Sequence, residues 1–472
     1  MVFSSLIFLY CFLPLNIILY YSVSSKSIRN SILIVFSLLF YAWGEPIWVG
    51  LLLCSTFVDY LNGLFIERHQ GKRLAWIGLL STLVFNLGIL MTFKYSDFII
   101  SNVNALCATT FTEPHFLLPI GISFYTFQSI SYCIDVYKGV VPAQKSFSKF
   151  LLFISLYHQL VAGPIVRYSH IADEISNRLF SWSDFSNGIT RFCKGLFKKV
   201  CIANLIGQIA AFFLDQELAG MSTPGVWYGI FLYALQMYFD FSGYSDMAIG
   251  LGLMFGFHYH ENFNYPFISK SITEYWRRWH ISLSTWLSDY VFMPIMIRMR
   301  NHKSLAICVG LISTFVISGI WHGAGWNFIF WGLYFGIWVY LENRFFLKFL
   351  KRTPKILQHI YFVVVLLPSW ALFYYTDHHK LLGVLKTMFS WNNQIEKTTE
   401  LLYSLKENSI IIVIAVTLTL PIYKWINQLF SKNQNGQLIG IYFNLLLNVI
   451  FLAISTFLLV GSSYNPFLYF RF

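Results

Sequence analysis

The chain has 472 residues, of which 57% are hydrophobic and only 11% are charged. Soluble domains average about 25% charged residues, so this composition excludes an ordinary soluble protein and indicates one that crosses a membrane several times. The net charge of +12 would suggest nucleic acid in a soluble protein. Here the basic residues are spread over short loops between apolar runs, where they set topology. We therefore expect the lipid bilayer as a partner, and no nucleic acid.

The apolar runs predict an all-α polytopic membrane protein, because a spanning helix needs roughly 20 apolar residues. They give about 11–13 transmembrane helices on that measure. The runs lie at 3–22, 31–43, 47–66, 74–93, 116–137, 198–214, 225–256, 304–321, 326–343, 357–375, 408–426 and 438–461. The first run has no basic residue ahead of it and no cleavage site behind it, so we expect it to be retained as a span.

Two further apolar stretches, 150–165 and 281–297, are predicted as re-entrant hairpins. If they were full spans, neighbouring basic loops would fall on opposite faces, against the tendency of Lys and Arg to stay in the cytoplasm. The pair Gly163-Pro164 and the residue Pro294 would supply the breaks that such hairpins need. The same charge bias places the N-terminus outside the cytoplasm.

The remaining segments indicate a single integral-membrane domain covering 1–472. Two longer polar segments stand out, at 165–195 and 376–407, the second on the outer side. A mixed-charge segment such as 376–407 is either a solvated surface or a docking surface for a partner outside the cytoplasm. The seven cysteines include no CxxC pair, so neither a disulfide framework nor a metal site is indicated.

A glycine-rich stretch at 318–327, between two apolar runs, contains the histidine that we regard as the main catalytic candidate, His322. An ionisable residue inside a membrane is costly and marks a functional site by default. The nearby Gly319, Gly323 and Gly325 remove side-chain bulk and are expected to break the helix and let a substrate approach. The alternative is a hydrogen-bonded histidine in the core.

A second polar cluster interrupts the run 225–256. At helical spacing Gln236 and Asp240 share a face, as do Ser242 and Asp246, and we expect both carboxylates to point into one interior region. Buried carboxylates without a partner would protonate rather than stay charged. The pair is either a polar contact between helices or part of a substrate site.

A third cluster combines arginine and tryptophan at a predicted cytoplasmic boundary, in 262–267 and 274–286. Such residues can anchor a helix in the interface, with tryptophans forming an aromatic belt. They would also suit the phosphates and adenine of a coenzyme A thioester, since arginine grips phosphate and an indole stacks a base. The provisional donor contacts are Asn262, Trp276, Arg277, Arg278 and Trp279.

A second histidine, His280, follows the arginine pair and is expected at the cytoplasmic mouth. His322 lies 42 residues later, at the far end of the span that begins near 304. We interpret the two histidines as marking opposite ends of one passage.

These motifs together resemble the membrane-bound O-acyltransferase (MBOAT) family, and within it the branch that O-acetylates alginate. The signatures are Trp276-Arg-Arg-Trp-His280-Ile-Ser282-Leu-Ser-Thr-Trp286 and Gly319-Ile-Trp321-His322-Gly323-Ala-Gly325-Trp326, with support from 119–125, 163–167 and 240–246. The resemblance implies a ring of helices, thin at its centre, with an acyl donor entering from the cytoplasm and an acceptor from outside. By the same resemblance, His322 matches the family's active-site histidine and His280 its second histidine.

The resemblance implies acetyl transfer from acetyl-CoA, a co-substrate and not a bound cofactor, to an extracytoplasmic polysaccharide in the bacterial inner membrane. A secreted esterase-like partner protein is expected on the outer side. A neutral imidazole suits the base that such a transfer needs, so we assign that role to His322. His280 is expected to position the donor or relay a proton, and Asp240 and Asp246 to support the site.

Two other readings stay open. The same fold could transfer D-alanine to teichoic acid, or acetyl to peptidoglycan. A protein of another class, a proton-coupled transporter or flippase, would also place carboxylates and histidines inside the membrane. No internal repeat is evident in the sequence, which counts against a transporter with duplicated halves.

Overall fold

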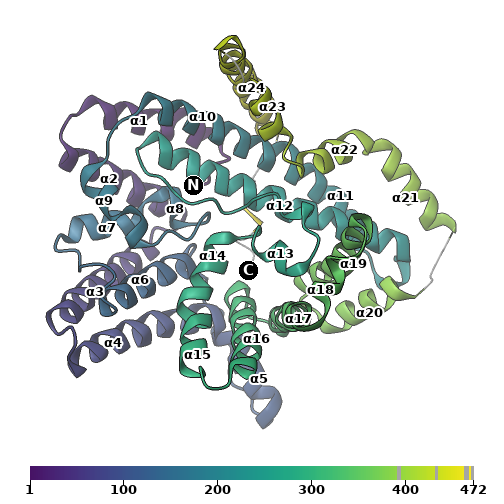
Figure 1. The fold of residues 1–472 in the computed structure, drawn as a ribbon, viewed down its shortest axis with the longest axis horizontal. Helices are drawn as coiled ribbons and strands as arrows, with labels where there is room; N and C mark the ends of the chain where they lie inside the picture. Colours follow the sequence, from purple (N-terminus) through teal and green to yellow (C-terminus); the bar gives the residue numbers. More distant parts are fainter. Residues whose placement is uncertain (391–394, 431–433, 462–466, 469–472) are drawn as a thin grey trace. The chain divides into compact units, whose positions relative to one another are not determined.

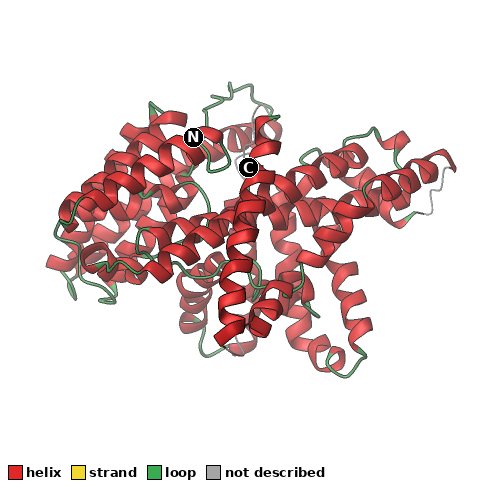
Figure 2. Cartoon of the chain, turned by 90° about the horizontal axis from the view of Figure 1, so that it is seen from above, coloured by secondary structure: helices red, strands yellow, loops and turns green. Residues whose placement is uncertain are grey.

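The structure of the chain is a computed structural model that describes residues 1–390, 395–430, 434–461 and 467–468. All regular secondary structure in these residues is helical, as Figure 2 shows in red. This confirms the all-α prediction. The chain groups into two compact units, each built from separate stretches of sequence. The prediction of one domain covering 1–472 stays a prediction.

Unit 1 comprises Met1–Phe192, Tyr244–His260 and, near the C-terminus, the described residues 459–461 and 467–468. Figure 1 shows α3, α4 and α6 side by side in purple and blue, and these three helices contact one another. The elements that begin in this unit are η1 (Phe8–Phe12), α1 (Leu13–Ser22), α2 (Lys26–Gly44), α3 (Trp48–Arg68), α4 (Arg73–Leu90), η2 (Met91–Tyr95), α5 (Ser96–Cys107), α6 (Ile122–Tyr137), α7 (Phe147–Ser155), α8 (Tyr157–Leu160), α9 (Tyr168–Asn177) and α10 (Trp182–Phe197).

Unit 2 comprises the described residues within Cys193–Gly243 and Glu261–Leu458. It contains both candidate histidines. The elements that begin here are η3 (Lys198–Ala203), α11 (Asn204–Leu214), η4 (Leu218–Gly220), α12 (Thr223–Met254), η5 (Pro266–Ile268), α13 (Ile272–Trp276), α14 (Ile281–Leu287), η6 (Ser288–Phe292), α15 (Met293–Arg298), α16 (Lys303–His322), α17 (Trp326–Leu341), η7 (Glu342–Phe346), α18 (Leu347–Leu350), α19 (Lys355–Tyr374), α20 (His378–Phe389), α21 (Ile395–Glu407), α22 (Ser409–Leu418), α23 (Ile422–Phe430) and α24 (Gln434–Val460).

Seven helices in the described residues are long and apolar enough to cross a membrane, or eight if the bent pair formed by α21 and α22 counts as one span. The chain is therefore a multi-pass membrane protein. The sequence predicted about 11–13 spans. The helices that the count of seven leaves out include the 16-residue α6 and α17 and the 32-residue α12. At 1.5 Å per residue a 16-residue helix is shorter than the roughly 30 Å hydrocarbon core, whereas α12 is longer than it.

The two predicted hairpins differ in the structure. The first is broken as expected: α7 and the four-residue α8 are followed by bends at 161–164, where Gly163 has a φ of +117°. The second is not broken at Pro294. The chain stays helical from Ile281 to Arg298, because Pro294 lies in the first turn of α15, directly after the π-helical η6, where proline is tolerated. The chain returns through α16.

The polar segment 376–407 is also more ordered than its composition suggested. It forms α20 and α21, and the stretch 391–394 between them lies outside the described residues. The Asp377 carboxylate begins α20 by accepting a hydrogen bond from the backbone N–H of Lys380 at 2.8 Å. This hydrogen bond to the helix N-terminus lowers the pKa of Asp377.

The pair α16–α17 carries the glycine-rich stretch on its connecting turn, and the two helices pack against each other (Figure 1). A Cβ atom on Gly319 would collide with the backbone carbonyl of Phe328, and one on Gly332 would collide with that of Phe315. Glycine is therefore needed here because the backbones of α16 and α17 approach closely, as in other membrane helix pairs.

We predict that Gly332→Ala lowers the thermal stability of the purified protein by about 1–3 kcal/mol, because overpacking separates α16 from α17. A matched control is Gly88→Ala in α4, since a Cβ at Gly88 has no atom within 4 Å. That change should leave stability unchanged or raise it slightly. Equal melting temperatures for Gly332→Ala and the wild type would contradict close packing at this position.

Candidate active site

The short helix α13 carries the arginine–tryptophan motif, and a buried carboxylate fixes its start. Glu342, fully buried in η7, accepts hydrogen bonds from the backbone N–H groups of Ile272 and Thr273, both at 2.7 Å. The hydroxyl of Tyr361 on α19 donates to the same carboxylate at 3.0 Å. A negative charge is favourable at a helix N-terminus, so Glu342 holds α13 against α19 and the end of α17.

The chain after α13 is tied to the loop that precedes it. Arg278 forms an ion pair with Glu274, with Nη2 2.9 Å from the carboxylate, and its Nη1 donates to the backbone carbonyl of Asn264 at 3.1 Å. Two backbone hydrogen bonds run alongside, from Asn264 N–H to the Arg278 carbonyl and from Ile281 N–H to the Asn262 carbonyl, both 2.9 Å. These contacts place Asn262 beside His280.

The amide of Asn262 sets which nitrogen of His280 carries a proton. The Asn262 Oδ1 atom accepts hydrogen bonds from the Ser282 backbone N–H at 3.3 Å and from the Ser282 hydroxyl at 2.8 Å. Because a backbone N–H can only donate, it must face the amide oxygen. His280 Nδ1, 3.0 Å from the same oxygen, must then carry the proton. The other nitrogen, Nε2, is left as a hydrogen-bond acceptor.

His280 Nε2 has no hydrogen-bond partner among the described residues, although the side chain is only 1% exposed. Buried nitrogen atoms are normally paired, so an unpaired one needs an explanation. The backbone of His280 is also left-handed, with φ +44° and ψ +53°, at the start of α14. Strained backbone of this kind concentrates at functional sites, where the surrounding structure holds it in place.

His322 is the last residue of α16, as the glycine-rich stretch predicted. Its ring is 5% exposed and packs edge-on against Trp331 of α17 and Phe373 of α19, with ring centroids 5.0 and 5.4 Å away. The turn that follows is extended, with φ −166° at Gly323 and at Gly325. Any residue can adopt such angles, so the turn does not need glycine for conformational freedom.

The expectation that the three glycines clear space for a substrate is not what the structure shows. A Cβ on Gly323 would meet the ring of Phe328, and one on Gly325 would lie 2.5 Å from Asn327 Oδ1. Protein atoms therefore fill the positions next to these glycines. The predicted helix break after His322 is confirmed, whereas the open space beside the glycines was a wrong interpretation.

One indole connects the two candidate histidines. The ring of Trp321 lies 5.1 Å from that of His322 and 6.0 Å from that of His280, centroid to centroid. His280 also packs edge-on against Phe241 of α12 at 4.6 Å. Unit 2 thus brings both imidazoles into one aromatic cluster, although they are 42 residues apart in the chain. Their assignment to opposite ends of a passage stays a prediction.

The two tryptophans of the motif lie inside unit 2. Trp276 is buried against Phe315, Trp331 and Phe335, and Trp279 is buried in a stack with Tyr275. Both indoles therefore pack against protein side chains on α13, α16 and α17. Neither is exposed, as a tryptophan of an interfacial aromatic belt would be. Stacking of a coenzyme base on either ring stays a prediction.

The two arginines have different surroundings. Arg278 is occupied by Glu274 and the Asn264 carbonyl, as described above. Arg277 is exposed, and its side chain forms no ion pair or hydrogen bond with the described residues. Of the two predicted phosphate contacts, only Arg277 thus has a guanidinium that is available for a ligand.

Asp240 and Asp246 do not point into one region. Asp240 lies in unit 2 and forms a buried ion pair with Lys199 of η3; both side chains are at most 5% exposed. Asp246 lies in unit 1 and pairs with Arg191 of α10 at 2.9 Å. Six residues on a helix turn the side chain by about 240°, so the two carboxylates face different neighbours. Both have basic partners, as in the alternative of polar contacts between helices.

Sequence reasoning missed two residues that support the site. The sequence analysis did not single out Lys199 or Glu342. Each is a charged residue at the second position from one end of a predicted span, in 198–214 and in 326–343, and this is the signal that would have found them. For metal binding, three ligand groups converge among the described residues at Asp97, Glu113 and His115 of unit 1. None of these belongs to the candidate site.

We predict that Arg278→Ala destabilises the protein by about 1 kcal/mol, because the partly exposed Glu274 carboxylate and the Asn264 carbonyl lose a charged donor. Its neighbour offers a control: Arg277→Ala removes the same side chain from an exposed position and should melt like the wild type. Thermal unfolding of both variants in detergent checks this. Equal losses would show that Arg278 has no special structural role.

Comparison with known proteins places this site in a family. Residues 142–376, which include both histidines, match the model of the MBOAT, membrane-bound O-acyltransferase family. The chain is 42% identical over 381 residues to a probable alginate O-acetylase AlgI of Azotobacter vinelandii, covering 79% of this chain and 75% of that protein. It is 32% identical to a peptidoglycan O-acetyltransferase of Helicobacter pylori, across 100% of this chain and 98% of that protein.

A teichoic acid D-alanyltransferase of Bacillus subtilis matches more narrowly, with 30% identity across 51% of this chain and 62% of that protein. All three relatives are named as acyl-transferring enzymes, which supports an acyltransferase here. The similarity to the alginate protein extends over most of both chains. This chain therefore belongs to the membrane-bound O-acyltransferase family.

Proposed function

We propose that the protein transfers acetyl groups from cytoplasmic acetyl-CoA to hydroxyl groups of an extracytoplasmic polysaccharide such as alginate. The observation that carries this proposal is that the buried imidazoles of His280 and His322 both contact the indole of Trp321. The Nε2 atom of His280 has no hydrogen-bond partner among the described residues. The named activity of the Azotobacter relative supports acetyl as the group and a polysaccharide as the acceptor. Acetyl-CoA is proposed as the donor because the chemistry needs an activated acyl thioester.

In the proposed reaction the acceptor oxygen attacks the thioester carbonyl carbon. A base removes the hydroxyl proton as the new C–O bond forms, and the C–S bond then breaks to release the thiol, which takes up a proton. His322 is the proposed base. His280 would accept or relay a proton through Nε2, because Asn262 holds the proton of this ring at Nδ1. Stabilisation of the developing oxyanion requires nearby donors.

Arg277 is the proposed contact to the phosphates of the donor, since its guanidinium is exposed and has no partner among the described residues. Guanidinium groups bind phosphate through paired hydrogen bonds. Asp240 supports the helices of unit 2 through its ion pair with Lys199, and Asp246 supports those of unit 1 through Arg191. This division of roles assigns donor capture to the exposed end of α13 and chemistry to the buried cluster.

The proposed setting is the bacterial inner membrane with the N-terminus outside the cytoplasm, following the bias of Lys and Arg toward cytoplasmic loops. A secreted esterase-like protein that receives the acetyl group is the proposed partner. A second acceptor is favoured by one observation: the peptidoglycan O-acetyltransferase of Helicobacter pylori matches the chain over its full length. Peptidoglycan is therefore the alternative polymer that we propose to test.

We predict that His322→Ala lowers transfer of radiolabelled acetyl from acetyl-CoA by at least about 10³-fold with unchanged protein level, because the base is lost. The exposed His302 offers a matched control, and His302→Ala should retain full activity. Membranes are incubated with alginate or peptidoglycan, so the assay also reports the acceptor. Retained transfer by His322→Ala would remove the central claim, and flux without covalent transfer would favour a transporter.

We predict that Asn262→Ala lowers kcat by roughly 10²-fold with little change in KM for acetyl-CoA, because His280 loses the acceptor that fixes its tautomer. Asn262→Asp keeps an acceptor oxygen at this position and should recover part of the rate. Asn264→Ala is the control, since the hydrogen bonds at Asn264 involve its backbone. A loss that falls on KM instead of kcat would contradict a role in positioning the imidazole.

A further inference from the structure

A surface cleft in unit 1 lies where several helices end. α1 ends at Ser22 and α2 begins at Lys26, and the cleft adjoins this turn. The residues that follow α9 and α12 close it on the other side, and α2 contacts both α1 and α9 (Figure 1). The lining includes Tyr20, Tyr21, Arg29, Arg178, Leu179 and Phe180.

The lining of this cleft holds two arginines and no acidic side chain. The guanidinium carbons of Arg29 and Arg178 lie 5.2 and 6.0 Å from the centre of the same ring, that of Tyr20. Two positive charges are thus held beside one tyrosine, where they repel each other. An anion between them would offset this repulsion.

Both arginines pair only with neutral groups among the described residues. Arg29 Nε donates to the backbone carbonyl of Val23 at 2.8 Å. All three nitrogens of Arg178 donate: Nε to the Tyr20 hydroxyl, Nη2 to the amide oxygen of Asn30, and Nη1 to backbone carbonyls of α9. Arg29 is therefore the arginine whose terminal N–H groups have no partner in the described part of the chain.

The acidic residues near the cleft in sequence are used elsewhere. Glu174, one helical turn before Arg178, has a carboxylate oxygen 2.8 Å from Nδ1 of His258. Asp184 contacts Nε2 of the same ring at 3.4 Å. Neither carboxylate forms an ion pair with Arg29 or Arg178, so within the described residues the two guanidinium charges have no counter-charge.

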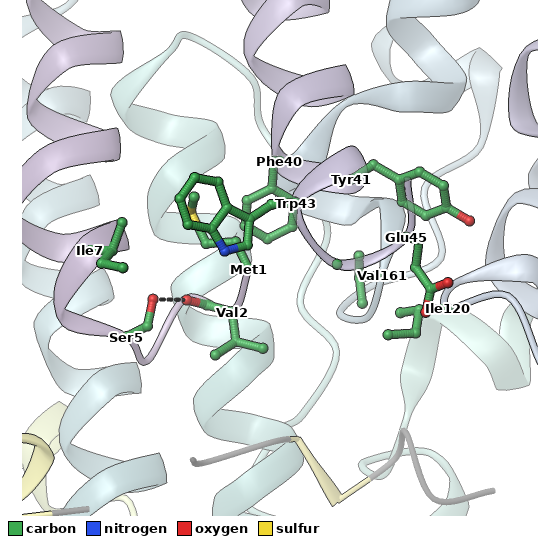
Figure 3. Close-up of a pocket in the computed structure, with 11 residues that line it drawn as sticks. Met1, Val2, Ser5, Ile7, Phe40, Tyr41, Trp43, Glu45, Ile120 and Val161 are labelled. Carbon is green, nitrogen blue, oxygen red and sulfur yellow. Dashed lines mark hydrogen bonds between the residues drawn. The ribbon is translucent and has the colours of Figure 1, made fainter. Parts of the chain in front are cut away.

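The larger cavity of unit 1 differs in this respect. It measures about 320 Å³, and its mostly apolar lining is shown as sticks in Figure 3. Its carboxylate, from Glu45, interacts electrostatically with the ammonium group of Met1 in the same lining. The charges of that cavity are balanced within its own walls, whereas those of the cleft are not.

The rim of the cleft is apolar and exposed. Leu179 is 80% exposed and Phe180 43%, and the ring of the 76%-exposed Trp182 lies 4.7 Å from that of Phe180. Exposed aromatic residues beside arginine are typical of the membrane–water interface. α2 is one of the seven candidate spans, and the cleft lies at its first turn. This position corresponds to a membrane surface.

The chemistry of the cleft selects an anion that carries hydrocarbon. A guanidinium group only donates hydrogen bonds, and it matches the oxygens of a phosphate. The free space of about 10 Å³ holds roughly one water-sized atom, so one oxygen enters and the rest of the group stays at the surface. A zwitterionic headgroup would bring a further positive charge to the two arginines.

We propose that this cleft binds the phosphate of an anionic phospholipid. One phosphate oxygen accepts from the terminal N–H groups of Arg29, and Arg178 adds positive charge while holding Tyr20 in place. The glycerol and the upper part of the acyl chains lie beside Leu179 and Phe180. The site is independent of the proposed acetyl transfer.

The test uses the full-length protein in nanodiscs of phosphatidylcholine. Two probes are compared as trace components, phosphatidylglycerol and phosphatidylcholine, each with a photoreactive diazirine near the carboxyl end of one acyl chain. Crosslinked peptides are mapped by mass spectrometry. We expect the phosphatidylglycerol probe to label the peptides that contain Leu179, Phe180 and Trp182 at least about fivefold more than the phosphatidylcholine probe. Equal labelling by the two probes in the wild type would overturn the proposal.

Arg29→Gln should lower labelling of these peptides by the phosphatidylglycerol probe at least about fivefold, because the donors to the phosphate are lost. The matched control is Lys26→Gln, an exposed cation of the same turn of α2 outside the lining, which should be labelled like the wild type. Equal losses in both variants would show a general attraction to the membrane surface and no site.

Soluble anions are the last arm of the test. Inorganic phosphate or coenzyme A added to the nanodiscs should leave the labelling unchanged. A loss of labelling with inorganic phosphate would replace the lipid with a soluble anion, and a loss with coenzyme A alone would assign the cleft to the acyl donor. Either result would overturn the proposal.

Discussion

A polar group that is buried inside a membrane protein has no water to bond with, and this constraint explains the architecture around the candidate site. Glu342 is fully buried and yet accepts hydrogen bonds from two backbone N–H groups and a tyrosine hydroxyl. Asp240 is buried only together with Lys199. Removing either side of such a contact leaves a charge in apolar surroundings, which costs far more than the contact contributes.

The same constraint gives meaning to atoms that remain unpaired. His280 Nδ1 is satisfied by Asn262, whose own oxygen is fixed by the backbone of Ser282. The lone pair at Nε2 is the one position on this ring without a partner among the described residues. The rings of Phe241 and Trp321 pack against this imidazole. A substrate hydroxyl that reached His280 could therefore donate its proton to Nε2, because no described group of the protein bonds to this nitrogen.

The sequence predicted the features that depend on composition and periodicity. The helix that ends at His322, the break at Gly163 and the all-helical fold follow from apolar runs and from glycine and proline, and all are present. Features that depend on which side chains meet across the fold were not predictable in this way. Arg277 and Arg278 are identical neighbours in sequence, yet one is held by Glu274 and the other is exposed.

The errors have a common physical origin. Helical spacing gives the direction of a side chain on its own helix but not the neighbour that it meets. Asp240 and Asp246 were therefore predicted to face one region, whereas Asp240 pairs with Lys199 and Asp246 pairs with Arg191. Hydrophobicity does not give the length of a helix either: the apolar runs at 116–137 and 326–343 contain α6 and α17, which have 16 residues each. Glycines were read as open space, whereas Phe328 and its backbone fill the positions beside Gly319 and Gly323.

The residues proposed for the chemistry all lie in one part of the chain. The segment that matches the acyltransferase family, 142–376, contains Asn262, His280 and His322. Relatives named for alginate, peptidoglycan and teichoic acid all match this chain, so their shared part has to hold what acyl transfer requires irrespective of the acceptor. The imidazole nitrogen of His280 can take up a proton, so an effect of Asn262 on kcat without an effect on KM follows from its contact with the opposite nitrogen.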